Sequence, residues 1–112
     1  MIPYWDFVFG QGSLEPRDSS AAAIASCGLL EACKYLPDSD EDKEVFLNAA
    51  HRMLDALIDL CENRTEEQDG FIHHVAHAQS LSDNPDGIEV YGDYFYFELL
   101  VRMLAPDIEM FW

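Results

Sequence analysis

The chain has few basic residues. Only 6 of its 112 residues are Lys or Arg, against 22 that are Asp or Glu, so its formal net charge at pH 7 is -16. A negative field of this size repels nucleic acid and anionic membranes, and neither is expected as a partner. An anionic ligand would need local cationic or neutral hydrogen-bond donors, and the arginines available are Arg17, Arg52, Arg64 and Arg102.

Cysteine is also scarce. Cys27, Cys33 and Cys61 are odd in number, lie in or beside apolar runs and form no CxxC pair. This pattern favours reduced core thiols over a disulfide framework, a zinc site or a redox site. The sequence shows neither an apolar run long enough for a membrane helix nor a secretion signal. We therefore expect a cytoplasmic location, provided that the chain's start is natural.

Alternating strand patterns are missing, and helical spacing takes their place. Hydrophobic residues make up 49% of the chain and aromatic residues 12%, which is too much for a disordered acidic tail. A chain of 112 residues has the usual size of one domain. The sequence thus predicts a single all-α domain over residues 1–112, with about three main helices and long irregular connections. Residues 1–18 are expected to be irregular but anchored by their aromatic side chains.

The first helix is predicted over residues 19–35. It begins near Asp18 or Ser19, whose side-chain oxygens can accept hydrogen bonds from the free amides of the first turn. It ends ahead of Pro37. Its only charged residues are Glu31 and Lys34. A helix that is apolar nearly all round is normally buried on several sides, and so short a chain has difficulty supplying every neighbour.

The second helix is predicted to open with the acids of residues 38–42 and to continue to about Glu62. Acids at this end suit the positive end of the helix dipole. They do not form a calcium loop, because Lys43 stands where glycine is needed and Ala49 where a bidentate glutamate is needed. The helix is amphipathic, since apolar residues recur at steps of three and four: Val45, Ala49, Met53, Leu57 and Leu60.

The third helix is predicted over residues 93–104, with Pro106 after its end. Glu98 and Arg102 stand four residues apart and are expected to interact. Before it come a charged turn at residues 64–70 and a long connection at residues 71–91, in which residues 83–87 are a strong turn signal. Ile72 and Val75 are expected to form a brief extended or helical stretch. Connections of this length are often functional.

Two motifs join a polar turn directly to an apolar helix: PRDSSAAAIASCGLLE at residues 16–31 and GDYFYFE at residues 92–98. With Tyr4-Trp5-Asp6-Phe7 ahead of them, they resemble the C-terminal part of the unsaturated glucuronyl hydrolase family of glycoside hydrolases. This family folds as a closed (α/α)6 toroid of six helical hairpins. The resemblance therefore implies a partial toroid, corresponding to roughly the last third of a family member. Residues 38–91 match mainly in pattern.

The resemblance also implies a reaction. Family members remove the 4,5-unsaturated uronic acid that polysaccharide lyases leave at the end of an oligosaccharide. An aspartate protonates C4 of the double bond, water adds at C5, and the hemiketal opens to release the neighbouring sugar, with no metal or other cofactor. The family's catalytic aspartates correspond to positions before Met1. No catalytic residue is therefore assigned here, and the isolated chain is expected not to be catalytic.

Three acids lie within the matching motifs. Asp18 and Asp93 are explained as helix caps, and Asp6 as a turn carboxylate. If one of them reaches a sugar, the expected role is to hold a hydroxyl group.

Aromatic and basic residues of the same motifs are the candidates for substrate contact. Tyr4, Trp5 and Tyr94 can stack on the apolar face of a sugar ring, although packing in a core also explains each of them. Arg17 is the best placed cation for the carboxylate of a uronic acid. Its alternative role is a salt bridge that holds the N-terminal segment to an acidic surface.

Histidines stand at the start of the long connection. His73 and His77 have the i, i+4 spacing of a zinc-binding helix, but the sequence offers no glutamate of the protease motif and no third ligand, so no metal is expected. In the resembling family the matching stretch leads into the loop at the leaving-sugar side of the pocket. The resemblance thus implies that His74 or His77 contacts sugar. Ordinary exposed or capping histidines remain the alternative.

Two functions stay open. In the first, the chain is a segment of an enzyme whose family binds unsaturated uronic-acid oligosaccharides. The apolar faces of its first and third helices then lack partners, and we expect a homo-oligomer or binding of the missing N-terminal portion. In the second, it is a non-enzymatic protein-interaction module derived from a hydrolase scaffold. A complete small enzyme with its own pair of carboxylates has the least support.

Overall fold

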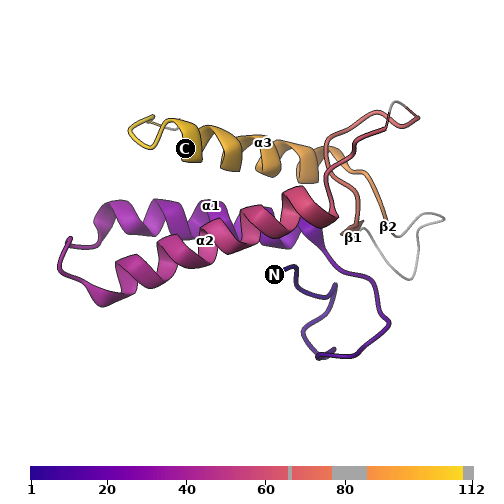
Figure 1. Cartoon of the computed structure of the whole chain (residues 1–112), viewed down its shortest axis with the longest axis horizontal. Helices are drawn as coiled ribbons and strands as arrows, with labels where there is room; N and C mark the ends of the chain where they lie inside the picture. The colour runs from indigo at the N-terminus through magenta and orange to yellow at the C-terminus, as the bar shows by residue number, and fades with distance from the viewer. Residues whose placement is uncertain (66, 77–85, 110–112) are drawn as a thin grey trace.

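The expected all-α class is confirmed. A computed structural model of the chain describes residues 1–65, 67–76 and 86–109. These residues form three helices and one pair of very short strands (Figure 1). In chain order the elements are α1 (Ser19–Tyr35), α2 (Glu41–Leu60), β1 (Val75–Ala76), β2 (Asp86–Gly87) and α3 (Val90–Leu104).

Helix α1 starts and ends where the sequence predicts. The carboxylate of Asp18 accepts hydrogen bonds from the backbone amides of Ser20 at 3.0 Å and Ala21 at 3.4 Å. These contacts satisfy two amides that have no partner within the helix. The helix ends at Tyr35, and the backbone of the next residue, Leu36, is extended, as expected for a residue before Pro37. The predicted capping role of Asp18 is confirmed.

Helix α2 begins at Glu41, within the acidic stretch expected to open it, and ends at Leu60, two residues before the expected end. The side chain of Asp40 accepts a hydrogen bond from the backbone amide of Asp42 at 3.0 Å, and acids fill the first turn. The helix closes at Cys61, whose amide donates to the carbonyl of Leu57 at 2.9 Å. The predicted apolar pattern is buried only in part: Leu57 is fully buried, Ala49 and Met53 are partly buried, and Val45 and Leu60 are exposed.

Helix α3 begins at Val90, three residues earlier than predicted, and Asp93 does not cap it. The carboxylate of Asp93 instead accepts hydrogen bonds from the backbone amides of Phe71 at 2.8 Å and Ile72 at 3.0 Å. The predicted role of Asp93 as a helix cap is therefore wrong. Its carboxylate satisfies backbone groups of the preceding connection, a long-range contact that has no local sequence signature.

The connection before α3 contains a ladder that the sequence did not predict. Strands β1 and β2 are antiparallel, with Val75 paired to Gly87 and Ala76 paired to Asp86. Two residues per strand are too few to show an alternating pattern. Ile72 lies in an isolated bridge with Glu62, so the expected brief extended stretch is present. The part of the predicted turn at residues 83–85 lies outside the described residues.

The helices form a layer with α1 in the middle. Helix α1 packs against both α2 and α3. Helices α1 and α3 run in the same direction and α2 runs in the opposite one (Figure 1). The starts of α1 and α3, the end of α2 and the short strands therefore gather at one end, which we call the helix-start end. Residues of all three helices and of the connection share the core: Ile2, Ala22, Ala23, Cys27, Leu57, Cys61, Ile72, Val75, Tyr96 and Leu99.

Two expectations about composition can be compared with the structure. Cys27, Cys33 and Cys61 are free thiols and are buried, as predicted. Across the described ranges, no helix has both the length and the apolar character that crossing a membrane requires.

Shortening a core side chain tests this packing. Leu57 is fully buried, so Leu57→Ala should lower the free energy of unfolding by about 2–5 kcal/mol, through lost burial and the cavity that remains. The exposed Val45 on the same helix provides the matched control, and Val45→Ala should change it by less than about 0.5 kcal/mol. Urea denaturation followed by circular dichroism measures both variants. Equal effects would mean that α2 does not pack through Leu57.

Candidate functional site

The N-terminal segment is tied back onto the start of α1. Tyr4 and Arg17 form an isolated antiparallel bridge, and the amide of Asp18 donates to the carbonyl of Pro3 at 2.9 Å. The amide of Trp5 donates to the carbonyl of Pro16 at 3.1 Å. These bonds close the irregular segment into a loop and confirm that it is anchored. They also bring Tyr4 and Arg17, which are distant in sequence, into contact.

Arg17 is held by a carbonyl and an aromatic ring. Its Nη1 donates to the carbonyl of Ile2 at 2.6 Å, its Nη2 donates to the hydroxyl of Tyr4 at 3.1 Å, and its guanidinium carbon lies 3.8 Å from the centre of the Tyr4 ring. The ion pairs of the described residues do not include Arg17, so the alternative salt bridge is not formed there. The positive charge of Arg17 is thus not neutralised by a described carboxylate.

Trp5 lies next to this pair but faces a different partner. Its indole nitrogen donates to Oε2 of Glu15 at 3.0 Å, and its ring centre is 5.6 Å from that of Phe9. Trp5 is partly exposed and Phe7 is almost fully exposed. The loop therefore presents aromatic side chains to solvent beside Arg17, although their size would normally favour burial.

His74 has an unusual backbone. Its φ angle is 64°, in the left-handed region that residues other than glycine seldom adopt, at a cost of order 1–3 kcal/mol. Its carbonyl accepts the amide of Ser19 at 2.8 Å, and the Ser19 hydroxyl donates to the carbonyl of His73 at 2.7 Å. Its ring Nδ1 lies 2.9 Å from Oδ1 of Asp86. The start of α1 and β2 thus fix His74 in this position and leave its Nε2 facing away from Asp86.

Arg17 and His74 meet in an open pocket at the helix-start end. The pocket has a volume of about 500 Å³, within the usual size of small-ligand sites. Its remaining lining residues are apolar or a thiol: Met1, Ile2, Leu60 and Cys61. Burial, with a smaller contribution from Asp86, raises the pKa of Cys61 to about 11, so this thiol is protonated and not nucleophilic at neutral pH.

This pocket can bind an anionic or polar ligand but lacks a carboxylic acid for proton transfer. A guanidinium and an imidazole can donate hydrogen bonds to a carboxylate or a sugar hydroxyl. No lining residue among those described is Asp or Glu. No group of three described His, Cys, Asp or Glu side chains is arranged to hold a metal ion. The arrangement therefore suits binding rather than acid–base catalysis.

The other predicted site residues do not join this pocket. Tyr94 lies on α3, half exposed, with its ring edge-on to Phe95 at 5.1 Å between centres. Burial and the negative charge of Glu98 raise the pKa of Tyr94. His77 lies outside the described residues. Sequence reasoning missed the pairing of His74 with Asp86, because the two residues meet only through the β1–β2 ladder.

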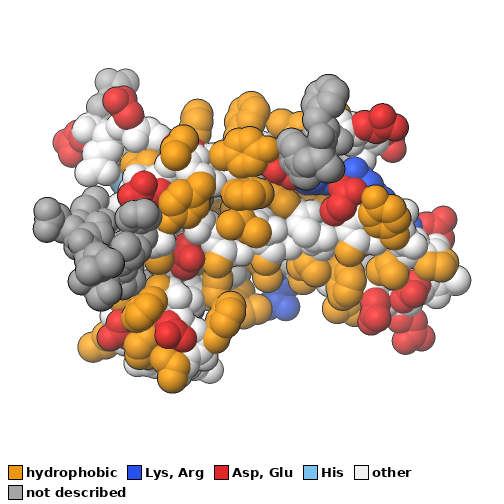
Figure 2. Space-filling view, turned by 180° about the vertical axis from the view of Figure 1, so that it is seen from behind, with side chains coloured by type: hydrophobic (Ala, Val, Ile, Leu, Met, Phe, Trp, Pro, Cys, Tyr) orange, Lys and Arg blue, Asp and Glu red, His pale blue; other side chains and the backbone are white. Residues whose placement is uncertain are grey.

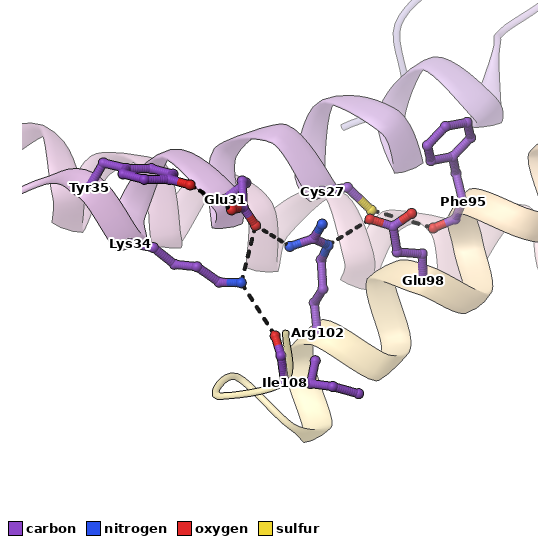
Figure 3. Close-up of polar contacts among 8 residues, drawn as sticks. All are labelled: Cys27, Glu31, Lys34, Tyr35, Phe95, Glu98, Arg102 and Ile108. Carbon is purple, nitrogen blue, oxygen red and sulfur yellow. Dashed lines mark hydrogen bonds and ion pairs between the residues drawn. The ribbon is translucent and has the colours of Figure 1, made fainter. Parts of the chain in front are cut away.

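A second polar cluster links α1 to α3 away from the pocket (Figure 3). Arg102 donates through Nε to Glu98 at 2.7 Å and through Nη1 to Glu31 at 2.6 Å, and Lys34 pairs with Glu31 at 3.1 Å. The predicted contact of Glu98 with Arg102 is confirmed. The contact of Glu31 with Arg102 was not predicted. The sequence held one sign of it, because Glu31 and Lys34 are the only charged residues of an otherwise apolar helix. Burial raises the pKa of the neighbouring Cys27 to about 12.

The cluster makes stability depend on pH. Hydrogen bonds from Arg102 and Lys34 lower the pKa of Glu31. A carboxylate with a lowered pKa contributes stability above its ordinary pKa, and this contribution is lost as the pH falls through the lowered value. Glu31→Gln should therefore be less stable than the wild type at pH 7, and the gap should close at acidic pH.

Thermal melts from pH 7 to pH 2.5 measure this gap. Glu67→Gln is the matched control, since Glu67 is an exposed acid outside the cluster, and it should track the wild type throughout. A gap for Glu31→Gln that stays constant with pH would contradict the assignment.

The chain resembles known hydrolases in sequence. No family model matches it. It is 38% identical over 112 residues to the unsaturated chondroitin disaccharide hydrolase of Streptococcus agalactiae, a match that covers 99% of this chain and 28% of that protein. It is 39% identical over 103 residues to the unsaturated glucuronyl hydrolase of Bacillus sp. strain GL1, covering 91% of this chain and 27% of that protein. The chain is thus homologous to part of these hydrolases and spans less than a third of their length.

Solved structures agree with the sequence comparison. The unsaturated glucuronyl hydrolase of Streptococcus agalactiae matches 99% of this chain and 28% of its own chain, with a TM-score of 0.91 and 38% identity. That of Bacillus sp. GL1 matches 94% and 28%, with a TM-score of 0.86. The fold is therefore a portion of the (α/α)6 toroid, as expected. Other matching structures contain dGlcA-GalNAc6S or dGlcA-Glc-Rha-Glc, so the relatives bind unsaturated uronic-acid oligosaccharides.

Proposed function

We propose that this chain, homologous to unsaturated glucuronyl hydrolases over nearly its whole length, is the C-terminal portion of such an enzyme. The complete enzyme would remove a 4,5-unsaturated uronic acid from an oligosaccharide by hydrating the double bond. One observation carries the proposal: 99% of the chain superimposes on such a hydrolase with a TM-score of 0.91 at 38% identity, while covering only 28% of it. Because only part of the enzyme's fold is present, we propose that the chain supplies some residues of the active site and lacks the others.

The contribution that we propose is recognition of the acidic sugar. The chain carries a formal charge of -16, so an anionic substrate needs a local cation to approach it. Arg17 supplies one at the helix-start end, with no described carboxylate paired to it, and His74 lines the same pocket. Trp5 is partly exposed beside Arg17 and offers a ring for the apolar face of a sugar. Tyr4 is buried, with the Arg17 guanidinium over its ring, and is proposed as a contact on the family resemblance alone. Tyr94, and His77 in the adjoining loop, are proposed as further contacts on the family resemblance alone.

The proton donor is proposed to come from the rest of the enzyme. Hydration of an enol ether needs an acid close to the carbon that receives the proton. The described pocket has no Asp or Glu among its lining residues. A chain that binds the sugar but has no acid to protonate it would form one part of the active site, and the rest of the enzyme would supply the other part. A homologue described as specific for heparin, 27% identical, indicates that the sugar preferred can differ between family members.

An interaction module is the second candidate function. It is favoured by the large apolar side chains that stay exposed on the helices, among them Phe97 and Leu104. A module of this kind would bind a protein and never take part in turnover. A cytoplasmic location also remains a proposal, and the three free, buried thiols support it.

Turnover separates the two functions. The purified chain should leave the absorbance of the conjugated double bond of an unsaturated chondroitin disaccharide unchanged. A chimera in which this chain replaces the matching part of the Streptococcus agalactiae relative should consume the double bond. A folded but inactive chimera would favour the interaction module, and turnover by the isolated chain would contradict the missing acid.

Arg17 can be tested in the active chimera. Losing one charge-assisted hydrogen bond weakens binding by about 1.5–3 kcal/mol, so Arg17→Ala should raise KM by about tenfold or more, with a smaller change in kcat. Arg17→Lys keeps the charge and should recover part of the loss. Arg64 provides the control, because it is exposed and pairs with Glu62, and Arg64→Ala should leave KM unchanged. An unchanged KM for Arg17→Ala would remove Arg17 from the substrate site.

A further inference from the structure

Asp86 lies behind one of the two polar residues of the pocket. It is not among the residues that line the pocket, but its Oδ1 is 2.9 Å from Nδ1 of His74, which is. His74 comes directly before β1, and Asp86 opens β2. The antiparallel pairing sets Asp86 opposite Ala76, and this brings the carboxylate to the imidazole. The ladder therefore has a defined consequence at the pocket, which is the contact between these two side chains.

Stability does not account for this contact. The side chain of His74 is 46% exposed and that of Asp86 is 41% exposed. Pairs that are exposed to this extent contribute little to the free energy of unfolding. The left-handed backbone of His74 is itself unfavourable, and two hydrogen bonds from Ser19 to this part of the connection hold it. The surrounding structure thus maintains the position of the ring at a cost, and strained residues of this kind cluster at binding and catalytic sites.

Direct attraction of a ligand does not account for Asp86 either. In the view from behind, acidic side chains already lie at the helix-start end, on the left (Figure 2). Asp86 is close enough to the pocket to help raise the pKa of Cys61, one of the lining residues. A carboxylate in this place opposes the approach of an anion. The effect of Asp86 that can favour binding is its contact with His74.

This contact determines which nitrogen of the imidazole carries the hydrogen. A carboxylate oxygen accepts hydrogen bonds and does not donate them, so Nδ1 of His74 is the protonated nitrogen. In the neutral ring, Nε2 is then an acceptor. Nε2 lies at the edge of the ring away from Asp86. The pocket therefore combines a donor, the guanidinium of Arg17, with an acceptor, the imidazole of His74.

We propose that Asp86 is a positioning residue, which holds His74 in the Nδ1–H tautomer so that Nε2 accepts a hydrogen bond from a hydroxyl group of the bound sugar acid. This inference rests on the proposed function and divides recognition between two residues. Arg17 donates to the carboxylate, and His74 accepts from the hydroxyl. A sugar acid offers both groups, whereas an anion without a hydroxyl leaves Nε2 without a donor.

Nitrogen NMR of the isotope-labelled isolated chain tests the tautomer without any ligand. At mildly alkaline pH, where an imidazole is normally neutral, the spectrum of His74 should show Nδ1 protonated and Nε2 unprotonated. Asp86→Ala removes the acceptor, and the ring should shift toward the Nε2–H form. Asp86→Asn keeps an amide oxygen that can accept and should retain the Nδ1–H form.

Asp69→Ala is the matched control for this spectrum. Asp69 is an exposed acid of the same connection and does not line the pocket, so its removal should leave the tautomer of His74 unchanged. Because the contact of His74 with Asp86 is largely exposed, all three variants should stay folded, which circular dichroism checks.

Kinetics of the active chimera with the Streptococcus agalactiae relative test the contact with the sugar. Asp86→Ala should raise KM by about two- to tenfold, the size of one neutral hydrogen bond. Loss of a negative charge alone acts in the opposite direction, because the substrate is an anion. Asp86→Asn makes the same change of charge but keeps the acceptor, so its KM should stay at or below that of the wild type.

His74→Asn shows whether Asp86 acts through His74. Asparagine tolerates the left-handed backbone better than most residues, so the strained position is kept while Nε2 is lost. His74→Asn should raise KM about as much as Asp86→Ala does. The double variant should show no further rise, because both changes remove the same contact.

The two experiments fail separately. A wild-type ring with its hydrogen on Nε2 would overturn the inference whatever the chimera does. In an active chimera, an unchanged or lower KM for Asp86→Ala would also overturn it, and so would additive effects of Asp86→Ala and His74→Asn. An inactive chimera together with the Nδ1–H tautomer in the isolated chain would refute the proposed function and still support the orientation of His74 by Asp86.

Discussion

The structure depends on the packing of two parallel helices, α1 and α3, side by side over one shared core. Helix α2, the connection after it and the N-terminal residues close the inner side around Leu57, Ile72 and Leu99. On the other side, the two helices expose large apolar side chains, among them Phe97 and Leu104. A helix layer has two faces and needs a partner on each that is apolar. This exposure agrees with the proposal that the chain is one portion of a larger enzyme.

The same pair of helices positions the candidate site. Because α1 and α3 start at the same end, the carboxylates of Asp18 and Asp93 lie there together. Asp18 accepts amides of its own helix and also the amide of Ala76 at 3.4 Å, while Asp93 accepts amides of the connection. These bonds hold the connection against the helix starts, and the amide of Asp18 holds the N-terminal segment there by donating to the carbonyl of Pro3. Arg17 and His74 reach one pocket because two helix ends fix the loops that carry them.

Local rules were sufficient for much of the fold. The bounds of α1 follow from the cap Asp18 and from Pro37, the start of α2 follows from the acids of residues 38–42, and the pair Glu98–Arg102 follows from its four-residue step. What the sequence could not supply is long-range. Asp93 looks like a cap, but its partners lie more than twenty residues earlier.

The site was predictable to a smaller extent. Motifs singled out Arg17 and His74 separately. Their shared pocket, the left-handed backbone of His74 and its contact with Asp86 arise from a ladder of two residues per strand, which leaves no pattern in a sequence. Glu31 joins Arg102 only because α1 and α3 pack side by side.

The most direct test of the account is a crystal structure of the assembled hydrolase that contains this chain, bound to an unsaturated disaccharide. The account predicts that Arg17 and His74 face the same cavity as an acid supplied by the other portion of the enzyme. A structure in which the sugar binds away from Arg17 and His74, or in which no acid from the other portion reaches their cavity, would contradict it.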